Sequence, residues 1–188
     1  MYQGEWHPHT NQRDGRGVQI WPDGSRYDGF WKDGMASGYG RLVHAEGDVY
    51  EGTWHEDKAN GFGVYTHYNG SRYEGQWLAD KQHGKGVEKW PDGAQYSGEY
   101  VEGMKHGKGK FIWSDQSTYD GDFYQNNIHG VGEYVWADGR VYKGDWVDNR
   151  MEGRGVFSWS DGRKYVGEYR NDQKHGNGTF TWPDGRSY

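Results

Sequence analysis

The chain has 188 residues, with 28 acidic and 22 basic side chains, 33 glycines and no cysteine, and 18% of its residues are Phe, Trp or Tyr. The lack of cysteine excludes disulfides and thiolate metal sites. The sequence has no run of Lys and Arg of the kind that would indicate a nucleic-acid partner. No apolar stretch approaches the ~20 residues of a membrane helix. No signal-peptide segment follows Met1, and glycine disfavours helices. The sequence therefore predicts a cytoplasmic, all-β protein whose rings pack against glycines.

Repeats follow one another along the whole chain, as in repeat proteins. From the second repeat on, the tyrosines that open them are 23 residues apart, and the first repeat has two extra residues within 7–14. We expect a single array over 1–188 that is part of a longer array or protein. Its eight repeats start at Tyr2, Tyr27, Tyr50, Tyr73, Tyr96, Tyr119, Tyr142 and Tyr165, and Tyr188 would begin a ninth.

Each repeat has one pattern, counted from its tyrosine as position 1. Position 3 is glycine, position 5 is aromatic, and positions 12 and 14 form Gly-x-Gly. Position 18 is Trp, or His in the repeats with His44 and His67, and positions 20 and 21 are usually Asp-Gly. Two stretches of alternating side chains separated by turn residues predict a β-hairpin in each repeat, with strands at roughly positions 1–6 and 13–18.

The register that we predict pairs position 1 with 18, position 3 with 16, and position 5 with 14. Each glycine then faces a ring, Tyr faces Trp, and all of them lie on one face of the sheet because side chains alternate. The turn at Gln116, where the glycine of Asp-Gly is missing, is expected to be the least regular. Stacked hairpins predict an elongated, single-layer antiparallel sheet, a solenoid-like rod of roughly 75 to 80 Å.

The pattern Tyr-x-Gly-x-Trp, then Gly-x-Gly, then Asp-Gly-x-x-Tyr resembles the MORN (membrane occupation and recognition nexus) repeat, from Tyr2 to Tyr188. MORN arrays occur in junctional membrane proteins, phosphoinositide kinases, radial-spoke proteins and cytoskeletal scaffolds, and beside a methyltransferase domain. The resemblance implies a binding module and leaves its partner open.

Three motifs suggest chemistry but have a structural interpretation that we prefer. Histidine recurs at position 11, but adjacent repeats are roughly 10 Å apart, too far for two histidines to share an ion; His7 and His9 are treated as exposed loop residues. The Gly-x-Gly with lysines at 106–111 lacks the Gly-Lys-Ser/Thr of a phosphate loop. Carboxylates at position 4 are expected to form a solvated row. We therefore predict no enzyme activity, no catalytic residues, no metal and no cofactor.

The aromatic stripe is the preferred binding site. Most of its rings are expected to form the core, but a single sheet has nothing above it, so part of the stripe is expected to remain open as a groove. A partner protein would lie in this groove as a helix or an extended peptide. The groove is placed in the later repeats, over Phe111, Trp113, Tyr134, Trp136, Phe157, Trp159, Phe180 and Trp182.

Other functions stay open at this point. Recognition of phosphoinositides or a membrane surface, on its own or as the targeting module of a lipid kinase, would use Arg140, Arg163, Lys164 and Arg186. Carbohydrate or choline binding by the aromatic ladder is a further alternative. Exposed strand edges would permit end-to-end self-association. The preferred function is a non-catalytic scaffold in the cytoplasm, at a cytoskeletal structure such as the cortex or a cilium, or at a membrane as a peripheral protein.

Overall fold

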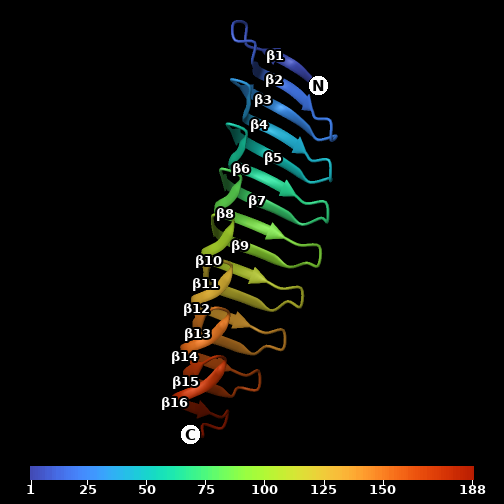
Figure 1. Ribbon diagram of the computed structural model, residues 1–188. Helices are drawn as coiled ribbons and strands as arrows, with labels where there is room; N and C mark the ends of the chain where they lie inside the picture. The colour runs from blue at the N-terminus through green and yellow to red at the C-terminus, as the bar shows by residue number, and fades with distance from the viewer. The chain divides into compact units, whose positions relative to one another are not determined.

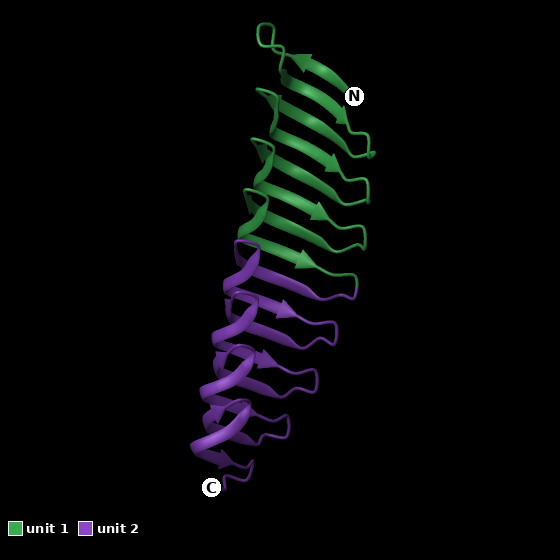
Figure 2. Ribbon diagram, in the orientation of Figure 1, with its two compact units in different colours: residues 1–91 green, residues 92–188 purple.

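The structure is a computed structural model that describes residues 1–188, and it contains sixteen β-strands and no helix. No helix therefore has the length and apolar composition needed to cross a bilayer. The chain divides into two compact units, Met1–Pro91 and Asp92–Tyr188 (Figure 2). Within each unit the strands form an antiparallel sheet in chain order (Figure 1).

The strands alternate between a shorter one that opens each repeat and a longer one that closes it. In the first unit they are β1 (Tyr2–Trp6), β2 (Arg13–Ile20), β3 (Arg26–Lys32), β4 (Met35–Val43), β5 (Val49–His55), β6 (Lys58–Thr66), β7 (Arg72–Leu78) and β8 (Lys81–Lys89). In the second unit they are β9 (Gln95–Val101), β10 (Met104–Ile112), β11 (Thr118–Tyr124), β12 (Asn127–Val135), β13 (Val141–Val147), β14 (Arg150–Ser158), β15 (Lys164–Arg170) and β16 (Gln173–Thr181). The predicted all-β fold of stacked 23-residue hairpins is confirmed.

From the second repeat on, the turn inside each hairpin is shorter than predicted. Between β13 and β14 it has two residues, Asp148 and Asn149, with φ values of 46° and 67°. Two successive positive φ angles define the type I′ turn that suits the twist of a hairpin. The second strand therefore begins at position 9 rather than near 13, and a bulge absorbs the additional residues. Gly153, at φ 68°, lies at this bulge, where the pairing shifts between Gly144 and Trp146.

The predicted register is wrong by two residues. Tyr119 pairs with Tyr134, and Gly121 pairs with Gly132, so position 1 lies opposite 16 and glycine lies opposite glycine. The two-residue turn and the bulge together set this register. Since a shift of two residues preserves the face on which each side chain lies, the rings still gather on one face, as predicted.

The repeat tyrosine fills the space above the glycine pair. A Cβ atom on Gly132 would overlap the ring and hydroxyl of Tyr119, which is fully buried. The Tyr119 hydroxyl donates a hydrogen bond of 2.9 Å to the carbonyl of Asp122. The ring also makes edge contacts with Phe123 at 5.2 Å and with Trp146 of the next repeat at 5.7 Å. The prediction that glycines make room for rings is confirmed, although the ring involved is the tyrosine of position 1.

In most repeats the hairpin turn is also hydrogen-bonded to the preceding repeat. The side-chain oxygen of Asn149 accepts a hydrogen bond of 2.8 Å from the backbone N–H of Ile128, and the N–H of Asn149 donates one of 2.9 Å to the Ile128 carbonyl. Asp172 contacts Met151 in the same way, at 2.7 and 3.1 Å. The Asp or Asn at position 8 therefore serves both its own turn and the contact between repeats.

The turn at Gln116 keeps the geometry of the others, contrary to expectation. Its N–H donates 2.9 Å to the Trp113 carbonyl, as Gly139 does to Trp136. This turn differs from the others in backbone strain. Gln116 adopts φ 70°, where a non-glycine residue is strained and glycine is not.

We expect Gln116→Gly to raise the free energy of unfolding by about 0.5 kcal/mol, because relief of about 1 kcal/mol of strain outweighs the added entropy of the unfolded chain. Urea unfolding measures the change. Gly139→Gln, the reverse substitution in the next repeat, is the matched control and is expected to destabilise by about 1 kcal/mol. A Gln116→Gly protein less stable than the original would contradict the assignment of strain.

Candidate functional site

The eight predicted groove residues form one continuous line of rings in the second unit, which we call the ring row. Neighbouring centroids lie 4.5 to 5.4 Å apart along the order Phe111, Trp113, Tyr134, Trp136, Phe157, Trp159, Phe180, Trp182. In each repeat the Phe or Tyr is the next-to-last residue of the longer strand, and the Trp follows directly after its end. Each intervening Trp contacts the ring of its own repeat and the ring of the next one.

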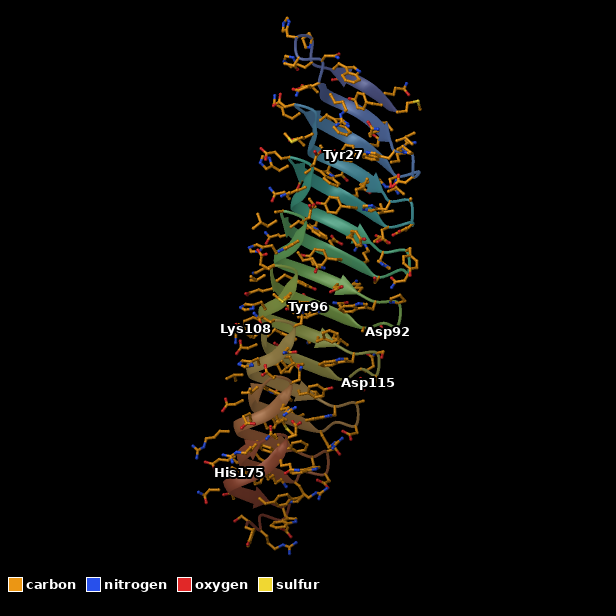
Figure 3. The ribbon with its side chains drawn as sticks, in the orientation of Figure 1. Tyr27, Asp92, Tyr96, Lys108, Asp115 and His175 are labelled. Atoms are coloured by element: carbon orange, nitrogen blue, oxygen red, sulfur yellow. The ribbon has the colours of Figure 1, made fainter.

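Turns hold these tryptophans in place. The backbone N–H of Trp136 donates 2.9 Å to the Arg140 carbonyl, and the Gly139 N–H donates 2.9 Å back to the Trp136 carbonyl. Figure 3 shows two such turns through Asp92 and Asp115 along one border of the second unit, with Tyr96 on the face beside them and Lys108 toward the opposite border. The Asp-Gly turn therefore sets where the Trp at each strand end lies.

Further hydrogen bonds fix the Tyr134 ring. Its hydroxyl lies 3.2 Å from Ser117 Oγ, and this buried serine donates 2.6 Å to Asp115. The hydrogen bonds from the Ser117 hydroxyl and N–H hold the pKa of Asp115 below its usual range. The carboxylate is thus ionised at neutral pH and keeps the chain from Asp115 to Tyr134 intact.

The ring row is open to solvent on one side. Phe157 is buried and the other seven rings are half-buried. The core lies beneath them, with the Trp146 ring 6.0 Å from that of Tyr134. The Trp146 indole donates 3.2 Å to the Gly132 carbonyl, whereas the indoles of the ring row donate to no group of the protein and are not enclosed. The row therefore presents partly exposed rings together with indole N–H donors that have no partner in the protein.

The first unit has no equivalent line. Its residues at positions 16 and 18 are Gln19, Trp21, Leu42, His44, Tyr65 and His67, with Glu88 and Trp90 in its last repeat. Tyr65 is hydrogen-bonded to Asp48, and burial together with this bond raises the pKa of Tyr65 to about 12. The predicted restriction of the row to the later repeats thus agrees with the contacts, while its role in binding stays a proposal.

The cations predicted for lipid contact are mostly paired. Arg140, Arg163 and Arg186 lie 2.8, 2.7 and 2.7 Å from the aspartate two residues earlier. Their guanidinium groups also lie 5.3 to 5.7 Å from the ring-row tryptophan of the same repeat. The hydrogen bonds from Arg140 lower the pKa of Asp138. Lys164 is exposed. The structure thus places three of these four cations beside the ring row, each with its charge compensated.

Sequence reasoning missed two lysines that border the row. The Lys174 ammonium lies 5.1 Å from the centroids of both Trp159 and Phe180, and that of Lys105 lies 5.9 Å from Phe111. Both occupy position 10, on the longer strand. The sequence signal for them was the alternation of side chains between the two faces of the longer strand. If that strand is taken to start at position 9, position 10 falls on the same face as the ring at position 16.

The carboxylates at position 4 have a structural role rather than forming a solvated row. Asp122, Asp145 and Glu168 accept backbone N–H groups at the bulge of the same hairpin, at 2.9, 2.8 and 3.1 Å. Burial opposes ionisation of Asp122, but the hydrogen bonds from Lys108 and the Val131 N–H prevail and lower its pKa. These side chains satisfy donors that the bulge leaves unpaired.

One core hydroxyl lacks a partner. The Tyr169 hydroxyl is buried without a hydrogen bond, whereas the Tyr142 hydroxyl donates 3.0 Å to the Asp145 carbonyl. We expect Tyr169→Phe to leave stability unchanged or to raise it by about 1 kcal/mol, because an unpaired buried hydroxyl is costly. Tyr142→Phe, the matched control, should lose about 1 kcal/mol. Thermal unfolding of both variants checks this; equal losses would mean that the Tyr169 hydroxyl finds a partner.

The stacked hairpins define an all-β repeat protein with an open row of rings on one face of its second unit. The chain belongs to the MORN repeat family, whose model matches residues 2–26, 27–49, 50–72, 73–95, 96–118, 119–139, 142–162 and 165–185. Among curated proteins, no sequence matches significantly.

Solved structures with a similar fold are domains of CPAP. The TCP10 domain of Danio rerio CPAP, in complex with a peptide of Danio rerio STIL, has a TM-score of 0.55 and 14% identity over 100% of this chain and 82% of that chain. The SAS-4 (dCPAP) TCP domain of Drosophila melanogaster, in complex with a proline-rich motif of Ana2 (dSTIL), has a TM-score of 0.50 and 13% identity over 99% and 96%. The G-box domain of the microcephaly protein CPAP has a TM-score of 0.51 and 16% identity over 93% and 97%. At such identities the likeness is one of fold.

Proposed function

We propose that this chain is a non-catalytic scaffold that binds a segment of a partner protein along the ring row, at a cytoskeletal structure. The observation that carries the proposal is the continuous line of eight rings in the second unit, of which seven are partly exposed. Contiguous apolar surface on a soluble protein usually marks an interaction site, and Trp, Tyr and Arg dominate the energetics of protein interfaces. The row combines Trp and Tyr with arginines at its border.

Similar folds support a peptide as the ligand. Two of the CPAP domains described above hold peptides of partner proteins. The G-box structure was interpreted as suggesting a role in centriole elongation, which supports a cytoskeletal setting. Binding of phosphoinositides has weaker support, because Arg140, Arg163 and Arg186 are already paired with aspartates.

Substitution in the middle of the row tests the proposal. Trp136→Ala removes the ring between Tyr134 and Phe157, at 4.6 and 5.3 Å from them. Peptides are selected from a displayed random library for binding to the original protein. Their affinity for Trp136→Ala is expected to be lower by about tenfold or more. Trp21→Ala, which changes the same repeat position in the first unit, is the matched control and should bind normally.

Two results would overturn the proposal. Peptides that bind Trp136→Ala as tightly as the original protein would place the site elsewhere. Flotation with phosphoinositide vesicles at physiological salt, abolished when Arg140, Arg163, Lys164 and Arg186 are neutralised, would make lipid recognition the primary function.

A further inference from the structure

The step between repeats along the ring row limits the conformation of the bound segment. Successive longer strands are two strand spacings apart, about 9.6 Å. Ring distances agree, since Phe157 and Phe180 are joined through Trp159 by 4.5 and 5.4 Å. A segment that lies along the row must therefore present an equivalent side chain about every 9.6 Å.

Only one regular conformation has this period. A polyproline II helix has three residues per turn and a rise of 3.1 Å, so its faces recur about every 9.3 Å. Over the three steps from Phe111 to Phe180 the mismatch is about 1 Å. In an α-helix, side chains on the same face recur after seven residues, or about 10.5 Å. Over the same three steps they would be displaced from the repeats by about 3 Å. In a β-strand, same-face side chains recur about every 6.8 Å and meet the repeats out of phase.

The hydrogen-bonding groups of the row also suit such a segment. Polyproline II has no internal hydrogen bonds, so its carbonyls remain available as acceptors. The indole N–H groups of the ring-row tryptophans are free, unlike the Trp146 indole that donates to Gly132. The rings of Trp136 and Trp159 are tilted at 36° to 49° to those of their neighbours in the row.

We infer that the ring row binds a proline-rich segment in the polyproline II conformation, with one apolar residue in every three packed on successive repeats and its carbonyls facing the indoles of Trp113, Trp136, Trp159 and Trp182. This inference rests on the proposed function and specifies the chemistry of the partner. The segment needs about ten residues to span the row at a rise of 3.1 Å.

The test is a titration of the whole chain with an oligoproline of about twelve residues, which as polyproline II is long enough to cover the row. The indole N–H resonances of the protein are followed by heteronuclear NMR. We expect those of Trp113, Trp136, Trp159 and Trp182 to shift and those of Trp31 and Trp54 to stay in place. A Gly-Ser peptide of equal length should cause no shift.

Variants separate ring packing from hydrogen bonding. Trp136→Phe keeps a ring and removes the donor, so it is expected to weaken oligoproline binding several-fold, and Trp136→Ala about tenfold or more. Trp21→Ala is the control and should leave binding unchanged. The chemical-shift dispersion of each variant reports whether it is folded.

Each other outcome overturns a defined part of the argument. If oligoproline causes no shift while a leucine-heptad peptide locked as an α-helix shifts the same indoles, the polyproline inference is wrong and the scaffold function stands. If neither peptide shifts any ring-row indole and library-selected peptides also bind Trp136→Ala normally, both the inference and the proposed function are wrong.

Discussion

Replacing Gly132 by alanine is expected to lower the free energy of unfolding by about 3 kcal/mol, the upper end of the usual cost of overpacking. The new Cβ would overlap the ring and hydroxyl of Tyr119. This ring has no room to withdraw, because it is fully buried, its hydroxyl is bonded to the Asp122 carbonyl, and it lies against Phe123 and Trp146. Urea unfolding followed by tryptophan fluorescence measures the loss.

Gly139→Ala is the matched control in the same unit. Gly139 has φ 87°, and a Cβ there would make only an ordinary contact of 3.6 Å with Ser160. Its substitution should therefore cost about 1 kcal/mol for the left-handed backbone alone. If Gly132→Ala cost no more than Gly139→Ala, the tyrosine ring would not be fixed over the glycine pair.

The hairpins and the composition of each face were predictable from sequence because the signal is repeated in every unit. Tyr at position 1, Gly at position 3 and the ring at position 5 alternate with polar residues, which places them on one face whatever the exact register. The error of two residues in the register therefore did not move the rings of Trp136 or Tyr134 to the other face, and the ring row is where its residues indicated.

The register itself was not predictable, because Gly-x-Gly is compatible with both a loop and a bulged strand. At Gly130, φ 96° places a bulge within β12, and the Asp122 carboxylate then accepts the Val131 N–H. Turn residues such as Asp33-Gly34 and Asp148-Asn149 do mark the two-residue turn, but the side-chain contact at the bulge has no distinct sequence signature. The length of the second strand depends on both.

Most contacts between repeats were also not predictable from the sequence. Asn149 reads as a turn residue, since Asn tolerates a positive φ, and its bond to Ile128 in the preceding repeat has no sequence signature of its own. The pairing of Arg140 with Asp138 could have been predicted, because an Asp that accepts the N–H two residues on forms a recognisable local turn. That turn explains why three of the four predicted lipid contacts have compensated charges.

Tyr119→Ala is expected to lower the free energy of unfolding by about 4 kcal/mol, since it empties the space above the glycine pair and removes edge contacts within and between repeats. Tyr119→Phe keeps the ring and should cost only about 1 kcal/mol, for the Asp122 carbonyl that loses its donor. Urea unfolding of both variants checks the difference, and hydrogen exchange should quicken most in β10 to β13, because repeats are stabilised mainly by their neighbours.

The double variant Tyr119→Ala, Gly132→Ala distinguishes the packing role of the tyrosine from a general loss of apolar surface. The three atoms nearest to a Cβ on residue 132 all belong to Tyr119, so without that ring we expect the double variant to be no less stable than Tyr119→Ala alone. Additive losses would mean that the methyl group is rejected by other groups, such as the backbone of Gly121 opposite it. Strong non-additivity would establish that the glycine at position 14 admits the tyrosine ring. The spacing of the ring row depends on the same close approach, since each longer strand carries both the position 14 glycine and, near its end, the ring-row Phe or Tyr.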